Sequence, residues 1–356
     1  MVCIAAFIIL CVIGLFVAFL SIFKKDLGRR YWVVFKKAWG CVGKKVRLQK
    51  CETNFKDDVK NSLLRKIVLK HPKWIKPVSV VIEILAIIIV VIAVWSIVEV
   101  VKALLALWAL GSCNVSKPSA CSLTSVTCSV DAAEPKNPIE ATGRWFEEWG
   151  EIFQAVPDKL REWKVEDYTV QPVVLANTDT AQPVAGLPDA LDIVDPGCAA
   201  CMQSYRNQLR SGFFQNHNTV LMIYPIQLAD GSYKFENSEL ISRYFYATAL
   251  TDTTASSKMI KRLFTESDAN GDNYQSAFLY QYSHDVAEKT LQNWLSDFGL
   301  SSQQISEIGK RLNSDQINQI LGQVRDTVNI QIRAKGIPLL IYDGKIHLGI
   351  YEAKYE

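Results

Sequence analysis

Two long apolar runs dominate the first third of the sequence. The first, Val2–Phe23, holds 22 residues without a charged side chain, which is long enough to cross a hydrocarbon core of about 30 Å. The second, Val78–Leu110, holds 33 residues with only three charged side chains among them. Apolar residues occupy all sides of a helix drawn through the second run, which is typical of a lipid-facing helix. The pattern predicts two transmembrane helices, residues 1–23 and 78–111.

A cleavable signal peptide is the alternative for the first run. No Lys or Arg precedes this run, no cleavage site of the small-x-small type follows it, and Lys24-Lys25 comes directly after it. This flanking pattern favours a membrane anchor over a signal peptide.

Charge is distributed unevenly along the chain, although the net charge is only +3. Residues 24–76 hold 17 Lys or Arg against 4 Asp or Glu, whereas the rest of the chain holds 22 against 32. Because short loops rich in Lys and Arg stay in the cytoplasm, residues 24–77 are predicted to be a cytoplasmic loop, with the N-terminus and the C-terminal domain outside. Aromatic residues alternate with the basic pairs of this loop, which beside a membrane favours contact with anionic lipid headgroups over nucleic acid.

Residues 112–167 read as an extracytoplasmic linker followed by aromatic helices. The linker carries Cys113, Cys121 and Cys128. Three cysteines allow one internal disulfide with one thiol left over, or an intermolecular bridge. Aromatic side chains recur at helical spacing from Ile139 to Lys164, where Pro157 is predicted to separate two helices. The acidic polar face of this segment favours packing of the aromatic face on the following domain over a position on the outer leaflet.

From residue 168 to 356 the pattern becomes that of a mixed α/β domain. Strands are predicted at Thr169–Leu175, Ala190–Asp195, Thr219–Pro225, Pro338–Tyr342 and Lys345–Ile350. A helix is predicted at Met202–Phe214, and helical patterns from about residue 237 to 313 predict a helical insertion. Asp343-Gly344, between the last two strands, is a strong hairpin signal.

The sequence Cys198-Ala199-Ala200-Cys201 is the strongest candidate for chemistry. It follows a predicted strand and begins a predicted helix, where free N–H groups and the helix dipole favour a thiolate. Two intervening residues let the two cysteines meet within one turn. Cys198 is expected to be exposed and nucleophilic, and Cys201 to be a buried resolving thiol. A permanent disulfide is a weaker alternative, and so is a zinc half-site, because no second cysteine pair lies near.

A strand, a CxxC motif and a helix, followed late in the chain by Gly336-Ile337-Pro338 and Gly344-Lys345, resemble the thioredoxin superfamily. The 140 residues between Cys198 and Pro338 are largely helical, which resembles the inserted subdomain of DsbA-like thiol–disulfide oxidoreductases. The resemblance spans roughly residues 169–356. It implies an α/β, thioredoxin-like fold with a helical insertion, preceded here by two transmembrane α-helices.

The resemblance also implies roles for individual residues. Cys198 corresponds to the nucleophile, Cys201 to the resolving cysteine and Pro338 to a cis-proline. Ile337, the residue before that proline, would then pair through its backbone with an incoming substrate strand.

The motif departs from the family pattern in ways that modulate its redox strength. Ala199-Ala200 offers no side-chain donor to a Cys198 thiolate, and Asp195 adds a negative charge that opposes thiolate formation if it lies close. We therefore expect a milder oxidant than relatives with His in the motif, and oxidase, reductase and isomerase activities all stay open.

The sequence thus predicts a membrane-anchored, extracytoplasmic thiol–disulfide oxidoreductase that forms or exchanges disulfides in exported proteins. The expected partners are protein thiols and disulfides, a membrane redox partner that recycles the cysteine pair, and the lipid membrane. No nucleic acid, cofactor or metal is expected. The alternative is a non-catalytic thioredoxin-like binding or scaffold module of an envelope complex, with a structural disulfide.

Overall fold

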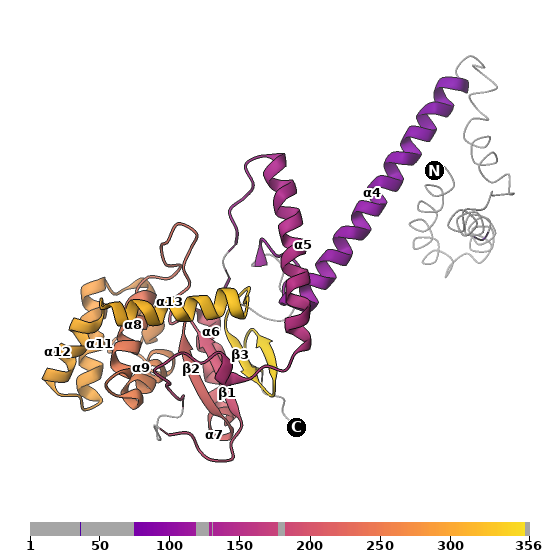
Figure 1. Ribbon diagram of the computed structural model, residues 1–356. Coiled ribbons are helices and arrows are strands. Elements are labelled where there is room, and N and C mark those ends of the chain that lie inside the picture. The colour runs from indigo at the N-terminus through magenta and orange to yellow at the C-terminus, as the bar shows by residue number, and fades with distance from the viewer. Residues whose placement is uncertain (1–35, 37–74, 119–127, 130, 177–181, 353–356) are drawn as a thin grey trace, which may run out of the picture. The chain divides into compact units, whose positions relative to one another are not determined.

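The computed structural model describes residues 36, 75–118, 128–129, 131–176 and 182–352 of the chain (Figure 1). The chain divides into two compact units, Met1–Val101 and Lys102–Glu356. The first predicted transmembrane helix and nearly all of the predicted cytoplasmic loop lie outside the described residues.

Helix α4 (Ile75–Leu110) contains the second predicted membrane helix and begins three residues earlier than predicted. Its part Ile87–Leu110 is long and apolar enough to cross a membrane. Large apolar side chains along it, such as Ile97 and Leu104, are exposed. Gly111 then adopts the left-handed backbone (φ +76°) that commonly ends a helix. The described residues therefore contain one candidate span.

A four-stranded sheet with the order β2-β1-β3-β4 forms the centre of the second unit. Its strands are β1 (Asp189–Val194), β2 (Asn218–Ile223), β3 (Leu339–Tyr342) and β4 (Lys345–Leu348). β1 and β2 are parallel, with Leu191 opposite Val220, whereas β3 runs antiparallel to both β1 and β4. Asp343-Gly344 joins β3 to β4, which confirms the predicted hairpin. The two parallel strands are buried over five consecutive residues each, as expected of strands covered on both faces.

The first predicted strand, Thr169–Leu175, is wrong as a regular strand. Only an isolated bridge joins Leu175 to Val220 at the outer edge of β2. Pro172 lies inside this segment and has no backbone N–H to donate, so a regular ladder of hydrogen bonds does not form there.

The predicted helix Met202–Phe214 forms as two helices, α6 (Ala199–Arg210) and α7 (Phe213–Asn216). Gly212 separates them with a φ of +74°. Helix α6 also begins earlier than predicted, so that its first turn includes the second half of the CxxC motif.

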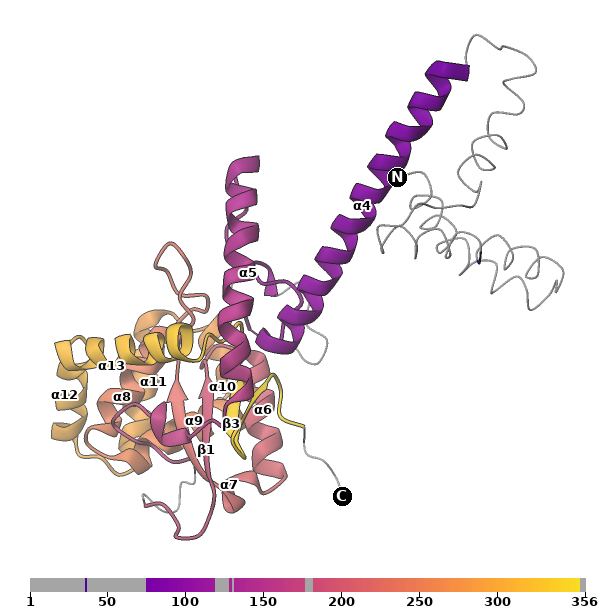
Figure 2. The same ribbon diagram turned by 45° about the vertical axis from the view of Figure 1, so that its right-hand side comes forward.

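The region between β2 and β3 is helical. It comprises α8 (Ser238–Ala249), α9 (Thr253–Thr265), α10 (Tyr274–Tyr280), α11 (His284–Asp297), α12 (Ser302–Arg311), α13 (Asp315–Asp326) and the π-helical turn η4 (Thr327–Gln331). Ser301 and Gln304 form the capping box at the start of α12. In the view of Figure 1, α8, α9, α11 and α12 lie to the left of β2, and the β3-β4 hairpin lies to the right of β1. In Figure 2, α8 and α12 again lie to the left of β1. A mixed α/β architecture with a helical insertion, as predicted, is confirmed.

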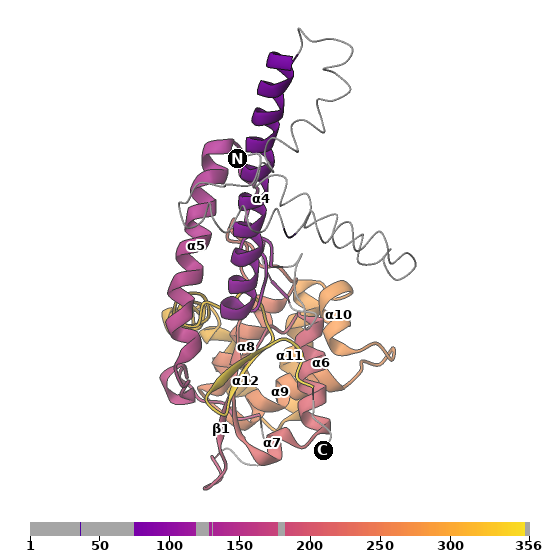
Figure 3. The same ribbon diagram turned by 90° about the vertical axis from the view of Figure 1, so that its right-hand side faces the viewer.

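Helix α5 (Pro138–Leu160) is continuous, so the predicted division at Pro157 is wrong. Pro157 lies in the last turn of the helix, where its missing N–H removes one hydrogen bond near the end rather than in the middle. The short 3₁₀-helix η3 (Val165–Asp167) follows it. In the views of Figures 1 and 3, α5 rises away from the sheet.

The predicted packing of this aromatic segment on the following domain holds for Trp163, which lies in the core of that domain, whereas the buried residues of α5 pack in a separate cluster with Ala106, Leu110 and Val115. Ile152 and Ala155 are buried, and Trp149 is half-buried. Phe146 and Phe153 are instead 63% and 61% exposed. The helix therefore presents one apolar side to its own unit and another to its surroundings.

Candidate redox site

The two motif cysteines lie at the N-terminus of α6. Cys198 is the N-cap residue, and its carbonyl accepts the N–H groups of Cys201 (3.0 Å) and Met202 (3.2 Å). Cys201 is the third residue of the helix, which confirms its predicted place in the first turn. Between them, Ala199 is exposed and Ala200 is buried. Neither alanine carries a polar group, so neither can donate a side-chain hydrogen bond to a Cys198 thiolate.

A tight turn before the motif holds Cys198 in place. A Cβ at Gly197 would lie 2.3 Å from Cβ of Phe235, so only glycine fits there. Gln275 of the helical insertion donates from Nε2 to the carbonyls of Pro196 (2.8 Å) and Cys198 (3.0 Å). The insertion therefore fixes the backbone of the motif. The sequence analysis missed Gln275 because its contact is 77 residues distant in the chain.

Cys198 forms a disulfide with Cys128 of the linker, 70 residues earlier, and Cys201 is a free, buried thiol. Cys113 is also disulfide-bonded. The prediction that Cys198 is exposed is wrong for this structure. Its exposed fraction is 0%, because the segment that carries Cys128 covers it.

The loop before β3 lies beside this disulfide. The Ile337–Pro338 peptide bond is cis, as predicted, and the Ile337 carbonyl oxygen lies 3.9 Å from Cys198 Sγ. The N–H of Cys128 donates to the Ile337 carbonyl (2.7 Å), and the N–H of Ile337 donates to the Cys128 carbonyl (3.0 Å). Cys128 therefore pairs with Ile337 as an antiparallel strand would, while its sulfur is bonded to Cys198.

Asp195 lies in the turn before the motif and contacts both cysteines, since its carbonyl accepts the N–H of Cys198 (3.1 Å). Its backbone N–H donates to Cys201 Sγ (3.4 Å). Its carboxylate accepts hydrogen bonds from the N–H groups of Gly197 and Ile226 (both 2.7 Å) and from the Ser238 hydroxyl. Burial raises the pKa of Asp195 to about 6 in spite of these bonds. The negative charge of Asp195 contributes to raising the pKa of Cys201.

Asp192 is a second buried acid near Cys201, and the sequence analysis missed it. It lies in the middle of β1 and accepts a hydrogen bond from Gln208 Nε2 (2.9 Å). Its other oxygen, Oδ1, has no hydrogen-bond partner among the described residues. Burial raises the pKa of Asp192 to about 7. An aspartate inside the otherwise apolar run Ala190–Val194 was the signal that could have identified it.

The resolving thiol is strongly affected by these surroundings. Burial raises the pKa of Cys201 well above its usual value, and the negative charges of Asp195 and Asp192 raise it further. A thiol of this kind reacts only when a neighbouring group takes its proton. Asp192, with a pKa near neutrality and a free oxygen, has the chemistry to do so.

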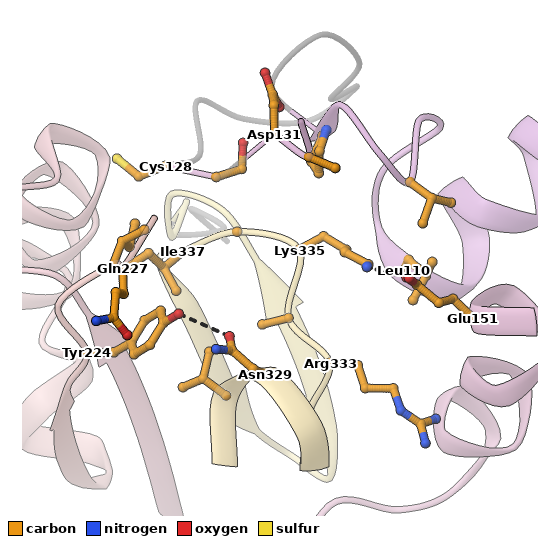
Figure 4. Close-up of a pocket in the computed structure, with 18 of the residues that line it drawn as sticks. Leu110, Cys128, Asp131, Glu151, Tyr224, Gln227, Asn329, Arg333, Lys335 and Ile337 are labelled. Carbon is orange, nitrogen blue, oxygen red and sulfur yellow. Dashed lines mark hydrogen bonds and ion pairs between the residues drawn. The ribbon is translucent and has the colours of Figure 1, made fainter. Parts of the chain in front are cut away.

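A cleft of about 780 Å³ opens beside the disulfide (Figure 4). Cys128 and Ile337 lie at one end of this cleft, and Leu110 and Glu151 lie toward the other. Across its floor, the Tyr224 hydroxyl donates to Asn329 Oδ1 (3.0 Å). The cleft therefore runs from Cys128 toward α5.

Ion pairs attach the loop before Pro338 to α5. Arg333 lies 3.0 Å from Asp158 and donates to the Gln154 carbonyl (2.9 Å), and Lys335 pairs with Glu151. These contacts hold one wall of the cleft against the helix that follows the linker. Within the described part of the chain, no three His, Cys, Asp or Glu side chains gather as a metal site.

No protein-family model and no curated protein sequence matches the chain. Solved structures with some similarity include the thiol-disulfide exchange protein alpha-DsbA2 from Wolbachia pipientis. It is 13% identical over 48% of this chain and 79% of its own, with a TM-score of 0.35. MdbA, a thiol-disulfide oxidoreductase from Corynebacterium matruchotii, is 14% identical over 49% and 81%, with a TM-score of 0.35. ScsC from Proteus mirabilis is 12% identical over 60% and 85%, also with a TM-score of 0.35.

Proposed function

We propose that this protein is a thiol–disulfide oxidoreductase that forms or exchanges disulfides in other proteins through Cys198 and Cys201. One observation carries the proposal. Cys198 is bonded to a cysteine outside its motif, the free thiol of Cys201 lies one turn into the same helix, and the backbone of Ile337 holds the bonded segment. This is the arrangement of a mixed disulfide beside the thiol that resolves it.

Each residue then has a chemical role. When a client thiolate attacks Cys198 of an oxidised pair, the bond to Cys201 breaks and Cys201 leaves as a thiolate that takes up a proton. A second client thiolate then attacks the client sulfur of this mixed disulfide, so the client disulfide forms and Cys198 leaves as a thiolate. In the reverse direction, Cys198 first attacks a client disulfide and one client thiol leaves. In the second step Cys201 attacks Cys198, so the other client sulfur leaves as a thiol and the bond between the two motif cysteines forms. Asp192 takes the proton from Cys201 in this second step. Backbone N–H groups at the start of α6 stabilise Cys198 as a thiolate.

The protein is proposed to act outside the cytoplasm as a membrane-anchored enzyme on exported proteins. The apolar part of α4 and the basic character of residues 24–76 support this orientation. The N-terminal apolar run Val2–Phe23 would add the other span of a two-pass anchor. A membrane redox partner would recycle the Cys198–Cys201 pair.

Orientation is measured by labelling the full chain in sealed cells with a thiol reagent that does not cross membranes. After mild reduction, the cysteines of the C-terminal unit should be modified, and Cys41 and Cys51 should be spared until the membrane is permeabilised. Labelling of Cys41 and Cys51 in intact cells, with the C-terminal unit protected, would reverse the proposed topology.

A second candidate function is a non-catalytic thioredoxin-like module in a membrane complex. Complete burial of Cys198 and its bond to Cys128 favour this alternative, because a permanent disulfide that attaches the linker to the domain would have the same geometry. The redox equilibrium of Cys198 and Cys201 with glutathione in the full chain separates the two functions. An oxidoreductase must cycle between thiol and disulfide at these positions, and a permanent disulfide must not.

A further inference from the structure

The segment that carries Cys128 is attached to the domain by more than its sulfur. Its backbone makes two hydrogen bonds with Ile337, and the ammonium group of Lys234 donates to the carbonyl of the next residue, Ser129. The N–H of Ala132 donates to the Ser116 carbonyl (2.7 Å), so these two residues of the linker lie side by side. Apart from its disulfide, Cys128 is held by main-chain hydrogen bonds, which do not depend on side-chain identity.

An incoming protein strand would need the same groups. Strand addition uses main-chain N–H and carbonyl groups, which at this site are those of Ile337. The client sulfur would need access to Cys198 Sγ, which Cys128 occupies. The linker of this chain and a client protein therefore compete for one backbone edge and one sulfur.

The position of Cys201 distinguishes this bond from an inert one. Its thiol is free, lies in the first turn of α6 and shares that turn with the bonded Cys198. A bond whose only task is to attach the linker has no need for a second thiol beside it. Burial of Cys201, which raises its pKa, also keeps it largely protonated and makes its attack slow.

We propose that Cys128 is a third redox residue of this protein, which takes the place of a client cysteine within its own chain and exchanges with Cys201 for the bond to Cys198. This proposal rests on the proposed function. In the exchange, Cys201 loses its proton and its sulfur attacks Cys198 Sγ. The bond between Cys128 and Cys198 breaks, the bond between Cys198 and Cys201 forms, and Cys128 takes up the proton. One disulfide is lost and one is gained, so no external oxidant or reductant is consumed.

The exchange gives the protein two forms with the same overall oxidation state, since each contains one disulfide and one thiol among these three cysteines. In the capped form Cys128 covers Cys198, and in the open form the motif carries the disulfide and the edge at Ile337 is available. An intrachain competitor acts at an effective concentration on the order of mM, well above that of a dilute client. The capped form therefore stores one disulfide and limits the reaction with clients.

The first test maps disulfides in the full chain, solubilised in detergent, by alkylation of free thiols and mass spectrometry of non-reduced peptides. In Cys201→Ser, Cys128 and Cys198 should be joined within one chain in most oxidised molecules, and alkylation of Cys128 should be low. Free Cys128 in most of these molecules, or a bond between two chains, would overturn the proposal.

The second test measures the rate at which the oxidised protein forms a disulfide in a reduced dithiol peptide. Cys128→Ser should react at least about tenfold faster than the wild type, because its intrachain competitor is gone. Ser129→Ala is the matched control, since it removes the neighbouring hydroxyl and keeps the sulfur, and it should react like the wild type. Equal rates for Cys128→Ser and wild type would overturn this inference while leaving the proposed function intact. Absence of reaction in Cys128→Ser, with an unchanged urea unfolding midpoint, would instead contradict the proposed function.

Discussion

Replacing Cys201 with Ala should trap this protein in mixed disulfides with its clients, whereas replacing Cys198 should trap almost none. Cys198 caps α6, where the free N–H groups and the helix dipole act on its sulfur, so a client is captured there. Cys201 is fully buried and is the thiol that releases the client. The substitution is best made together with Cys128→Ser, because Cys198 then has no partner in its own chain.

Non-reducing electrophoresis of the full chain from its native membrane measures the effect. The Cys128→Ser, Cys201→Ala chain should show at least about tenfold more reducible high-mass adducts than Cys128→Ser, Cys198→Ala, because a mixed disulfide without its resolving thiol persists. Adducts of equal amount in both chains, or adducts that depend on Cys201 alone, would show that Cys198 is not the attacking residue.

Replacing Asp192 with Asn should slow the resolution of a mixed disulfide by about a hundredfold near neutral pH, the usual contribution of a general base. In the wild type, the resolution rate should rise with pH through the Asp192 pKa of about 7, where the carboxylate becomes able to accept the proton of Cys201. In Asp192→Asn this rise should move to higher pH. Burial is the largest cause of the raised pKa of Cys201, so removing one negative charge leaves that pKa high.

The same substitution should change how stability depends on pH. The pKa of Asp192 is higher in the folded chain than its ordinary value of 3.8, so folding favours the protonated form. Its stabilising contribution is therefore complete below the unfolded pKa and is lost as the pH rises through about 7. The loss is on the order of a few kcal/mol, since one pKa unit corresponds to about 1.4 kcal/mol.

Stopped-flow release of a fluorescent client peptide and urea unfolding at several pH values measure both effects. Asp189→Asn is the control, because Asp189 is the exposed residue at the start of the same strand. It should leave the rate profile unchanged. An Asp192→Asn chain with the rate and the pH profile of the wild type would remove Asp192 from the mechanism.

Several features of this site were predictable because they are local in sequence. The turn Asp343-Gly344 specifies a hairpin by its own backbone preferences. The cysteine pair between a strand and a helix predicted that Cys201 lies in a first turn. The cis bond at Pro338 and its place near Cys198 are not local, and they were expected only from the resemblance to the thioredoxin superfamily.

Other features were not predictable because they depend on contacts between distant segments. The bond between Cys128 and Cys198 joins residues 70 positions apart, and cysteine spacing alone does not decide such a pairing. Asp192 is buried because helices cover β1. The contact of Asp195 with the Cys201 thiol depends on how the turn folds beneath that thiol. Pro157 was expected to break a helix, but the effect of a proline depends on its distance from the helix end.

The redox equilibrium of the motif cysteines with glutathione, in the full chain, tests the central claim most directly. It is measured by alkylation and mass spectrometry for the wild type and for Cys128→Ser, with Cys198→Ser as the control that has no redox pair. The account predicts that Cys198 and Cys201 of Cys128→Ser interconvert between thiols and disulfide, with a potential between about −270 and −120 mV, the range of thiol–disulfide oxidoreductases. A bond at Cys198 that stays oxidised below about −300 mV, as structural disulfides do, or motif cysteines that never exchange with glutathione, would contradict the account.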